Sequence, residues 1–260
     1  MHRKMRGEQG ELHIVDHGRD GPATLFIHSS AGNVTHWASQ MEALASRYRV
    51  VAVDLRGHGE SDSPMNGDYS VKALSADVGR VIDELELAPC VLVGHSIGGI
   101  VALDYAAHHP EAVKGLFLLD PGNDSRHRSG EQKQALVRAM RENYQETSEG
   151  YWQTLIGTDE GVRTRLMNDL HIASPEAMRG EMQAMFDYDP LPALDEFKNP
   201  MFCLVAKSTQ SPSSLHVLRP DSPHEVVADT GHWLQLSQPA RVTQALQNFL
   251  AELDDPKEER

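Results

Sequence analysis

Residues 91–99 read VLVGHSIGG, an apolar run that stops at a Gly-X-Ser-X-Gly turn. A buried strand that runs directly into a helix needs a tight turn. The small residues Gly94, Gly98 and Gly99 let the backbone fold closely enough to present the hydroxyl of Ser96. This pattern alone occurs by chance in many proteins. The sequence on both sides of the turn therefore decides whether Ser96 is a nucleophile.

Apolar runs on both sides of this turn alternate with helical patterns. The runs that predict buried strands cover residues 23–28, 48–53, 113–119, 200–206 and 225–228. Between residues 71 and 85, apolar side chains recur on one helical face. A small-residue helix is expected over 97–108, closed by His109 and Pro110. Strands that alternate with helices predict an α/β fold with a parallel sheet covered on both faces.

Four motifs follow predicted strands, and their order and spacing resemble those of the α/β-hydrolase superfamily over roughly residues 11–252. They are HSSAG at 28–32, DLRGHGES at 54–61, the Ser96 turn and GHW at 231–233. The resemblance implies an α/β-hydrolase fold, with a mostly parallel central sheet, flanking helices and an inserted helical cap. It says little about the substrate, because this fold carries many chemistries.

The pattern changes between residues 121 and 199, where strand-like runs give way to charged, amphipathic stretches rich in methionine. Helices are expected over 134–144, 151–156, 161–170 and 175–186, separated by breakers such as Gly157 and Pro175. We interpret 121–199 as a helical cap inserted into a core made of 1–120 and 200–260. Such a cap would cover Ser96.

Composition narrows the functional classes. The chain has 260 residues, 40% of them hydrophobic and 24% charged, which is ordinary for a globular protein. Its formal net charge of −14 argues against nucleic acid and anionic membrane surfaces as partners. Cys90 and Cys203 fall in or beside predicted core strands, so no disulfide framework is expected. No signal-like or membrane-spanning run appears, which predicts a cytoplasmic location. The sequence does not indicate an oligomeric state.

The base and the oxyanion donors follow from the resemblance. His232, in the Gly-His-Trp turn, matches the general base of similar hydrolases. His95 is expected to point to the far side of the turn and to be structural. The residue after the nucleophile, Ile97, supplies one oxyanion-hole N–H. Ser30 matches the second donor. Most relatives have glycine at the position of Ser29, whereas enol-lactonase-like relatives have serine there, as this chain does.

The orienting acid departs from the usual pattern. Many relatives carry an aspartate shortly after the strand that corresponds to 200–206, but that position is near Thr209, and 198–220 contains no Asp or Glu. Haloalkane-dehalogenase-like and some lactonase-like relatives place the acid at the end of the strand after the elbow helix. Asp120 occupies that place. Three alternatives stay open. Asp124 could be the acid, Asp120 could only form a turn before Pro121, or a Ser-His dyad could act without an acid.

A substrate pocket is expected between the cap and the core. Its predicted lining consists of Ser29, Trp37, Trp152, Met182, Met185, Phe186 and Trp233, although Trp37 could instead pack the loop that carries it. The methionines suit an irregular apolar group, or they pack the cap onto the core. Neither His13 with His17 nor His108 with His109 forms a credible metal site, so no metal and no cofactor is predicted.

These residues predict a serine hydrolase that acts on a small-molecule substrate, either a carboxylic ester or a lactone of small to medium size and apolar character. Ser96 argues against haloalkane dehalogenase or epoxide hydrolase chemistry, because relatives with those activities have an aspartate there. Carbon–carbon bond hydrolysis or perhydrolysis on the same triad is an alternative. A non-catalytic small-molecule receptor of the same fold is another, because the usual carboxylate after Ala206 is missing.

Overall fold

The computed structural model describes residues 1–17, 21–126 and 128–255. Within these residues, eight strands form one sheet in the order β1-β2-β4-β3-β5-β6-β7-β8. The pairs β1/β2 and β2/β4 are antiparallel, and every other pair is parallel. The strands are β1 (His2–Arg6), β2 (Glu11–His17), β3 (Ala23–Ile27), β4 (Arg49–Val53), β5 (Cys90–His95), β6 (Val113–Leu119), β7 (Met201–Ala206) and β8 (His224–Val227).

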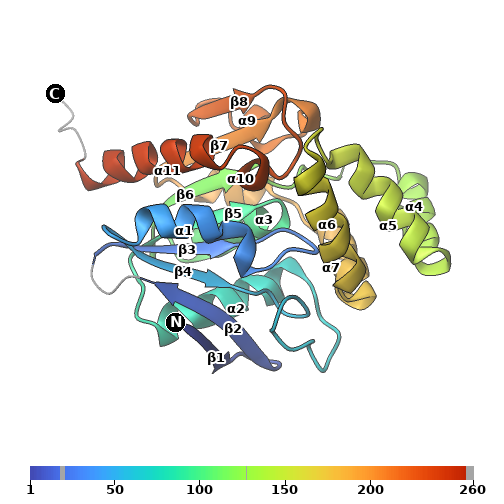
Figure 1. The fold of residues 1–260 in the computed structure, drawn as a ribbon, viewed down its shortest axis with the longest axis horizontal. Coiled ribbons are helices and arrows are strands. Elements are labelled where there is room, and N and C mark those ends of the chain that lie inside the picture. The colour runs from blue at the N-terminus through green and yellow to red at the C-terminus, as the bar shows by residue number, and fades with distance from the viewer. Residues whose placement is uncertain (18–20, 127, 256–260) are drawn as a thin grey trace.

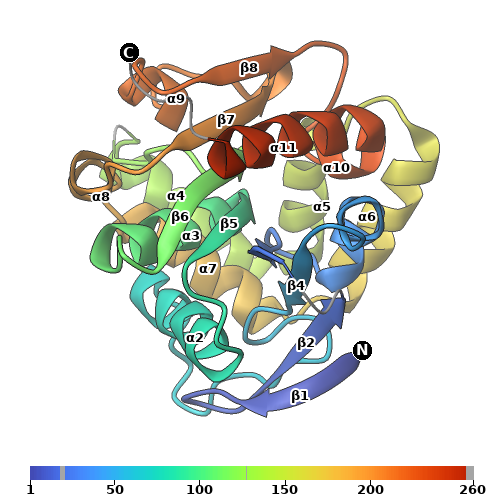
Figure 2. The ribbon, with the colours of Figure 1, turned by 90° about the vertical axis from the view of Figure 1, so that its left-hand side faces the viewer.

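Helices connect the strands and cover both faces of the sheet (Figures 1 and 2). They are α1 (Ala38–Leu44), α2 (Val71–Glu84), α3 (Ile97–His108), α4 (Gly130–Glu142), α5 (Tyr144–Leu155), α6 (Glu160–Ile172), α7 (Pro175–Asp187), α8 (Leu191–Glu196), α9 (Leu215–Leu218), α10 (Leu234–Ser237) and α11 (Pro239–Asp254). Two short 3₁₀ turns, Val34–Trp37 and Lys207–Thr209, follow β3 and β7.

Alternating side chains of the central strands divide the core into two layers, because successive residues of a strand point to opposite faces. On one face, Leu25, Leu92 and Leu116 pack against α2, α3 and α8. On the other face, Phe26 and Phe117 pack against α1 and α11. All five of these side chains are fully buried. The central strands are thus buried on both sides, which explains their continuous apolar sequence.

The expected strands and the helices at 71–85 and 97–108 are confirmed to within a few residues. The two antiparallel strands β1 and β2 were missed. Their sequences, HRKMR and ELHIVDH, mix charged and apolar residues, and β1 exposes four of its five side chains. An edge strand that buries so little carries only a weak periodic signal.

Between β6 and β7 the chain forms α4 to α8, and the four predicted cap helices are confirmed as α4 to α7. Figure 1 shows α4, α5, α6 and α7 gathered at one end of the molecule, beyond the sheet. They form a separate apolar cluster around Trp152, Leu166, Leu170 and Met178, which also contains Trp233 from the core. Helix α8 instead packs against α3. The helices α4 to α7 therefore rest on the loops at one end of the sheet.

In the described part of the chain, every helix is too short or too polar to cross a bilayer.

Candidate active site

The turn between β5 and α3 places Ser96 in a strained conformation, with φ 55° and ψ −120°. Positive φ costs free energy for a residue with a side chain, so the surrounding structure must enforce it. Gly98 shows how tightly the turn packs. A Cβ atom there would lie 2.5 Å from the carbonyl oxygens of both Ile27 and His28. Close backbone packing between this turn and the end of β3 therefore fixes Ser96, which lines a cavity.

Asp120 follows β6 directly and also has positive φ, at 39°. Its backbone N–H donates to Leu204 O at 2.7 Å, and its Oδ1 accepts from the Ala206 N–H at 3.1 Å. Its Oδ2 lies 2.5 Å from Nδ1 of His232. Both side chains are nearly buried, with 2% of Asp120 and 10% of His232 exposed. The carboxylate holds the hydrogen on Nδ1, so Nε2 is the nitrogen of His232 that can accept a proton.

Thr209 stands where the usual acid would be, and it contacts Asp120. Its Oγ1 lies 2.8 Å from Oδ1 and 2.8 Å from Oδ2 of Asp120, and 3.0 Å from Ala206 O. A hydroxyl that donates to a carboxylate stabilises its ionised form. The end of β7 therefore contacts a carboxylate that comes from the end of β6. The sequence did not reveal this contact, because it depends on how β6 and β7 pair.

His95 lies behind His232 and supports the loop that carries it. Its Nε2 donates to His232 O at 2.9 Å, and its Nδ1 accepts from Gln235 Nε2 at 3.0 Å. The two imidazole rings are 4.6 Å apart between centroids. Burial, reinforced by the neighbouring His232, lowers the pKa of His95 well below its ordinary value. A neutral ring can donate on one side and accept on the other, as this position requires.

One hydrogen bond within the loop after β3 and two to other segments hold this loop in place. His28 Nδ1 donates to Ser29 O at 2.7 Å, and its Nε2 accepts from the Leu55 N–H at 2.9 Å. Burial lowers the pKa of His28 well below its ordinary value, which keeps the ring neutral for these two bonds. Ser29 Oγ accepts from Trp233 Nε1 at 3.2 Å. The serine that replaces the usual glycine thus ties this loop to the His232 loop.

Ser30 and Ile97 were predicted to supply the two oxyanion donors. Ser30 lines the same cavity as Ser96. The N–H of Ile97 belongs to the first turn of α3, where helix geometry provides no intrahelical acceptor. A donor in that position is available to an oxyanion at Ser96.

A buried glutamate of the α7 helix reaches this loop. Glu181 is 0% exposed, and its Oε2 lies 3.6 Å from Nε2 of His58, which is buried as well. Burial raises the pKa of Glu181, while His58 and the Ser30 hydroxyl act in the opposite direction. The sequence analysis missed this residue, because a Glu in an amphipathic helix ordinarily faces solvent. Through Glu181, α7 is coupled to the loop that carries Ser30.

A cavity of about 370 Å³ lies between these loops and the helices α4, α5 and α7. Ser96, Asp120, His232 and Ser30 all line it. Its walls include six of the seven residues predicted for the pocket: Ser29, Trp152, Met182, Met185, Phe186 and Trp233. Six of the seven residues predicted for the pocket therefore line this cavity.

The pocket role predicted for Trp37 is wrong, and the alternative, that it packs the loop that carries it, agrees with the structure. Its side chain is 0% exposed and packs in the core, with its ring centroid 5.2 Å from that of Phe26 and 6.5 Å from that of His95. A ligand in the cavity cannot reach it. Trp37 ends the 3₁₀ turn after β3 and fills the layer beneath α1 and α11.

Further lining residues were missed. Leu136 and Met140 on α4 are four residues apart and face the cavity together with Tyr151. The i,i+4 spacing on an amphipathic helix is the signal that could have identified the first two. Ser211 and Ser213, which follow β7, add hydroxyls to the wall. The cavity is consequently apolar toward the α4–α7 helices and polar toward the strand ends.

The alternative acid, Asp124, lies in a different arrangement. It is nearly buried, and its Oδ2 accepts from Nη2 of Arg126 at 2.8 Å. Within the described residues, one group has the ligand types and the closeness that a metal ion requires, namely His2, His13 and Glu60. None of these three lines the cavity.

Comparison of the sequence and the fold with those of known proteins identifies the family. The sequence profile of the alpha/beta hydrolase fold family matches residues 22–170, and the chain belongs to this family. The chain is 28% identical to the sn-1-specific diacylglycerol lipase ABHD11 of Mus musculus, over 92% of this chain and 84% of the lipase. It is 38% identical to Epoxide hydrolase 4 of Mus musculus, but over only 42% of this chain and 31% of that protein.

Solved structures share the fold over nearly the whole chain. A thermophilic esterase from Thermogutta terrifontis superposes with a TM-score of 0.83 at 25% identity, covering 97% of this chain and 99% of the esterase. The predicted α/β-hydrolase fold is thus confirmed.

Proposed function

We propose that this protein is a serine hydrolase in which Ser96 is the nucleophile, His232 the general base and Asp120 the orienting acid. The observation that carries the proposal is the 2.5 Å contact between Asp120 Oδ2 and His232 Nδ1, in a cavity that Ser96 also lines. A buried carboxylate on Nδ1 is what a base needs in order to present Nε2 to a hydroxyl. The Ser-His dyad without an acid therefore loses its support.

In the proposed mechanism, Nε2 of His232 takes the Ser96 proton while Oγ attacks the carbonyl carbon of the substrate. The N–H groups of Ser30 and Ile97 stabilise the oxyanion that forms. The protonated His232 then gives its proton to the leaving alkoxide, which leaves an acyl-enzyme. Water, deprotonated by the same imidazole, hydrolyses the ester of Ser96 and restores the enzyme. The Asp120 carboxylate stabilises the imidazolium in both steps.

The substrate is proposed to be a carboxylic ester or lactone with a small to medium apolar group. The supporting observation is a cavity of about 370 Å³ whose wall toward the helices contains Trp152, Met182 and Phe186. The relative that aligns over 92% of this chain is named as a lipase, and the esterase from Thermogutta terrifontis shares the fold. Both names refer to ester cleavage, which favours this substrate class over epoxides.

The part of residues 121–199 that precedes α8 is proposed to act as a cap over the site. Side chains from α4, α5 and α7 line the cavity, and Glu181 is buried against the core loop. A cover of this kind excludes bulk water and selects substrates by size. The helix α8 packs against α3 and belongs to the core layer in this proposal.

The test combines hydrolysis of p-nitrophenyl esters of increasing acyl length with labelling by an alkyl fluorophosphonate. Wild-type protein should turn over a short ester and should be labelled on Ser96, as mass spectrometry of the peptides can establish. Ser96→Ala should lower kcat by about 10⁶. Ser39→Ala removes an exposed hydroxyl on α1, away from the cavity, and serves as the control. If the folded wild type is neither labelled nor faster than Ser96→Ala with any ester, the proposal fails.

A further inference from the structure

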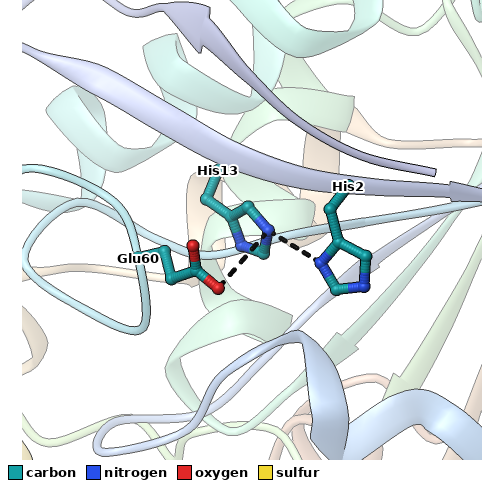
Figure 3. A group of neighbouring side chains, drawn as sticks. All are labelled: His2, His13 and Glu60. Atoms are coloured by element: carbon teal, nitrogen blue, oxygen red, sulfur yellow. Dashed lines mark hydrogen bonds and ion pairs between the residues drawn. The ribbon is translucent and has the colours of Figure 1, made fainter.

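Two histidines and a glutamate meet on the opposite side of β4 from the catalytic loops, at the antiparallel edge of the sheet. His2 pairs with Val15, and Lys4 pairs with His13, so His2 and His13 lie diagonally on the same face of the β1/β2 ribbon. Nδ1 of His2 is 3.1 Å from Nε2 of His13. Oε1 of Glu60 lies 4.0 Å from the same Nε2. Figure 3 shows the three side chains turned toward one another.

A fourth residue, Asp54, orients two members of this group. Its Oδ2 lies 2.7 Å from His13 Nδ1 and also accepts from the Glu60 N–H at 3.0 Å. Its Oδ1 accepts from the Val34 N–H at 2.7 Å, which anchors the carboxylate in the core. A carboxylate on one imidazole nitrogen fixes the tautomer and makes the other nitrogen more basic. Nε2 of His13 therefore presents its lone pair to His2 and Glu60.

We propose that His2, His13 and Glu60 form a binding site for a divalent transition-metal ion of the zinc class. Imidazole and carboxylate are the ligands that Zn²⁺ prefers besides thiolate. Two nitrogen ligands at zinc-bond length in a tetrahedral site are about 3.3 Å apart, close to the 3.1 Å found between the two rings. The Glu60 side chain is 69% exposed, so it can move the short distance that coordination requires. Water would complete the coordination.

The His2–His13 contact has two readings, and they differ in chemistry. The lone pair of His13 Nε2 either accepts a hydrogen bond from a protonated Nδ1 of His2 or binds a cation that both nitrogens share. The carboxylate of Glu60 on the same side favours the cation, because it adds the negative charge that two neutral rings lack. A hydrogen bond between two rings does not need it.

The site is independent of the proposed function, because none of its three side chains lines the catalytic cavity. An ion there would join the edge strand β1 to β2 and to the loop after β4. β1 pairs with β2 alone and exposes most of its side chains. The ion would therefore stabilise the fold by tying down its least buried strand, without supplying any chemistry to Ser96.

The experiment titrates ZnCl₂ into the full chain, produced without a polyhistidine tag and stripped with EDTA, with isothermal titration calorimetry as the readout. The wild type should bind one zinc per chain, and its Tm should rise with added zinc. His2→Ala and Glu60→Gln should each weaken binding by at least about tenfold. Both residues are exposed, so the fold tolerates these changes. His17→Ala removes an exposed histidine from β2, the strand that carries His13, and this variant should bind zinc like the wild type.

Absence of a one-to-one isotherm in the wild type would overturn the proposal. So would unchanged affinity in either His2→Ala or Glu60→Gln, or equal weakening in His17→Ala. Ester hydrolysis by Ser96 should be the same with and without zinc, so the outcome is separate from that of the catalytic proposal.

Discussion

The turns after β5 and β6 hold neighbouring parts of one site, but they are built in different ways. The turn at Ser96 is made largely from its own sequence. A Cβ at Gly94 would collide with the backbone of Gly98 and Gly99, and a Cβ at Gly98 would collide with the end of β3. The turn at Asp120 has no comparable motif. Its carboxylate is held by Ala206 and Thr209 from the end of β7 and by His232 from the loop after β8. The turn that carries Ser96 can thus be specified locally, whereas the position of the Asp120 carboxylate depends on two distant segments.

Among the changes that test this comparison, the largest loss of activity is expected for a substitution at Asp120, in the turn after β6. Asp120→Asn keeps the shape of the side chain but removes the charge that holds the His232 tautomer, so kcat for ester hydrolysis should fall by about 10⁴. Steady-state kinetics with a p-nitrophenyl ester will measure it, with circular dichroism to verify folding. Asp187→Asn, which replaces an exposed carboxylate on α7 by a carboxamide, is the control. A loss below about tenfold would remove Asp120 from the acid role.

A side chain added at Gly98 should destabilise the turn at Ser96 by steric collision. Gly98→Ala places a Cβ 2.5 Å from two carbonyl oxygens, so the turn must shift. We expect the free energy of unfolding to fall by about 1–3 kcal/mol, as measured by urea denaturation. Gly130→Ala is the matched control, since a Cβ there meets nothing within 4 Å. Equal stability of Gly98→Ala and the wild type would show that local glycine packing does not determine the elbow.

A double variant can move the acid from one strand end to the other. Thr209 Oγ1 lies 2.8 Å from the Asp120 oxygen that holds His232, so a carboxylate at 209 is close enough to replace it. Asp120→Asn with Thr209→Asp should recover at least about tenfold of the lost kcat. The control is Asp120→Asn with Thr209→Asn, because asparagine at position 209 has the shape of aspartate without its charge. If both double variants are equally slow, the end of β7 cannot supply the acid in this fold.

The smallest effect is expected at a contact outside both turns, between α7 and the Ser30 loop. Burial raises the pKa of Glu181, so the fold favours its neutral form. The stability that this group contributes is full below the ordinary pKa of a glutamate, and it is lost as the pH rises through the raised pKa. Glu181→Gln stays neutral throughout. The stability of the wild type relative to Glu181→Gln should therefore fall from acidic to mildly alkaline pH.

Urea denaturation at several pH values measures this difference, and Glu176→Gln, exposed on the same helix, is the control. A difference that stays constant with pH would show that the proton on Glu181 does not influence the fold.

Much of the fold could be predicted because the central strands are buried on both faces. Such strands need continuous apolar runs, and the glycines at 94, 98 and 99 are needed where a strand turns sharply into a helix. These are short-range requirements, so the sequence displays them. β1 exposes most of its residues and lacks such requirements, and β2 carries charged residues at both ends of a short apolar run, so neither strand shows a clear pattern.

The sequence by itself determined the α/β alternation, the Ser96 turn and part of the lining of the cavity. Only the tertiary structure decided that Asp120 reaches His232, that Thr209 supports that carboxylate, that Trp37 lies in the core and that His2, His13 and Glu60 meet. The physical reason is the range of the contact. Backbone sterics and hydrophobic periodicity act over a few residues, whereas side chains 89 or 112 positions apart meet only when the sheet fixes their strands side by side.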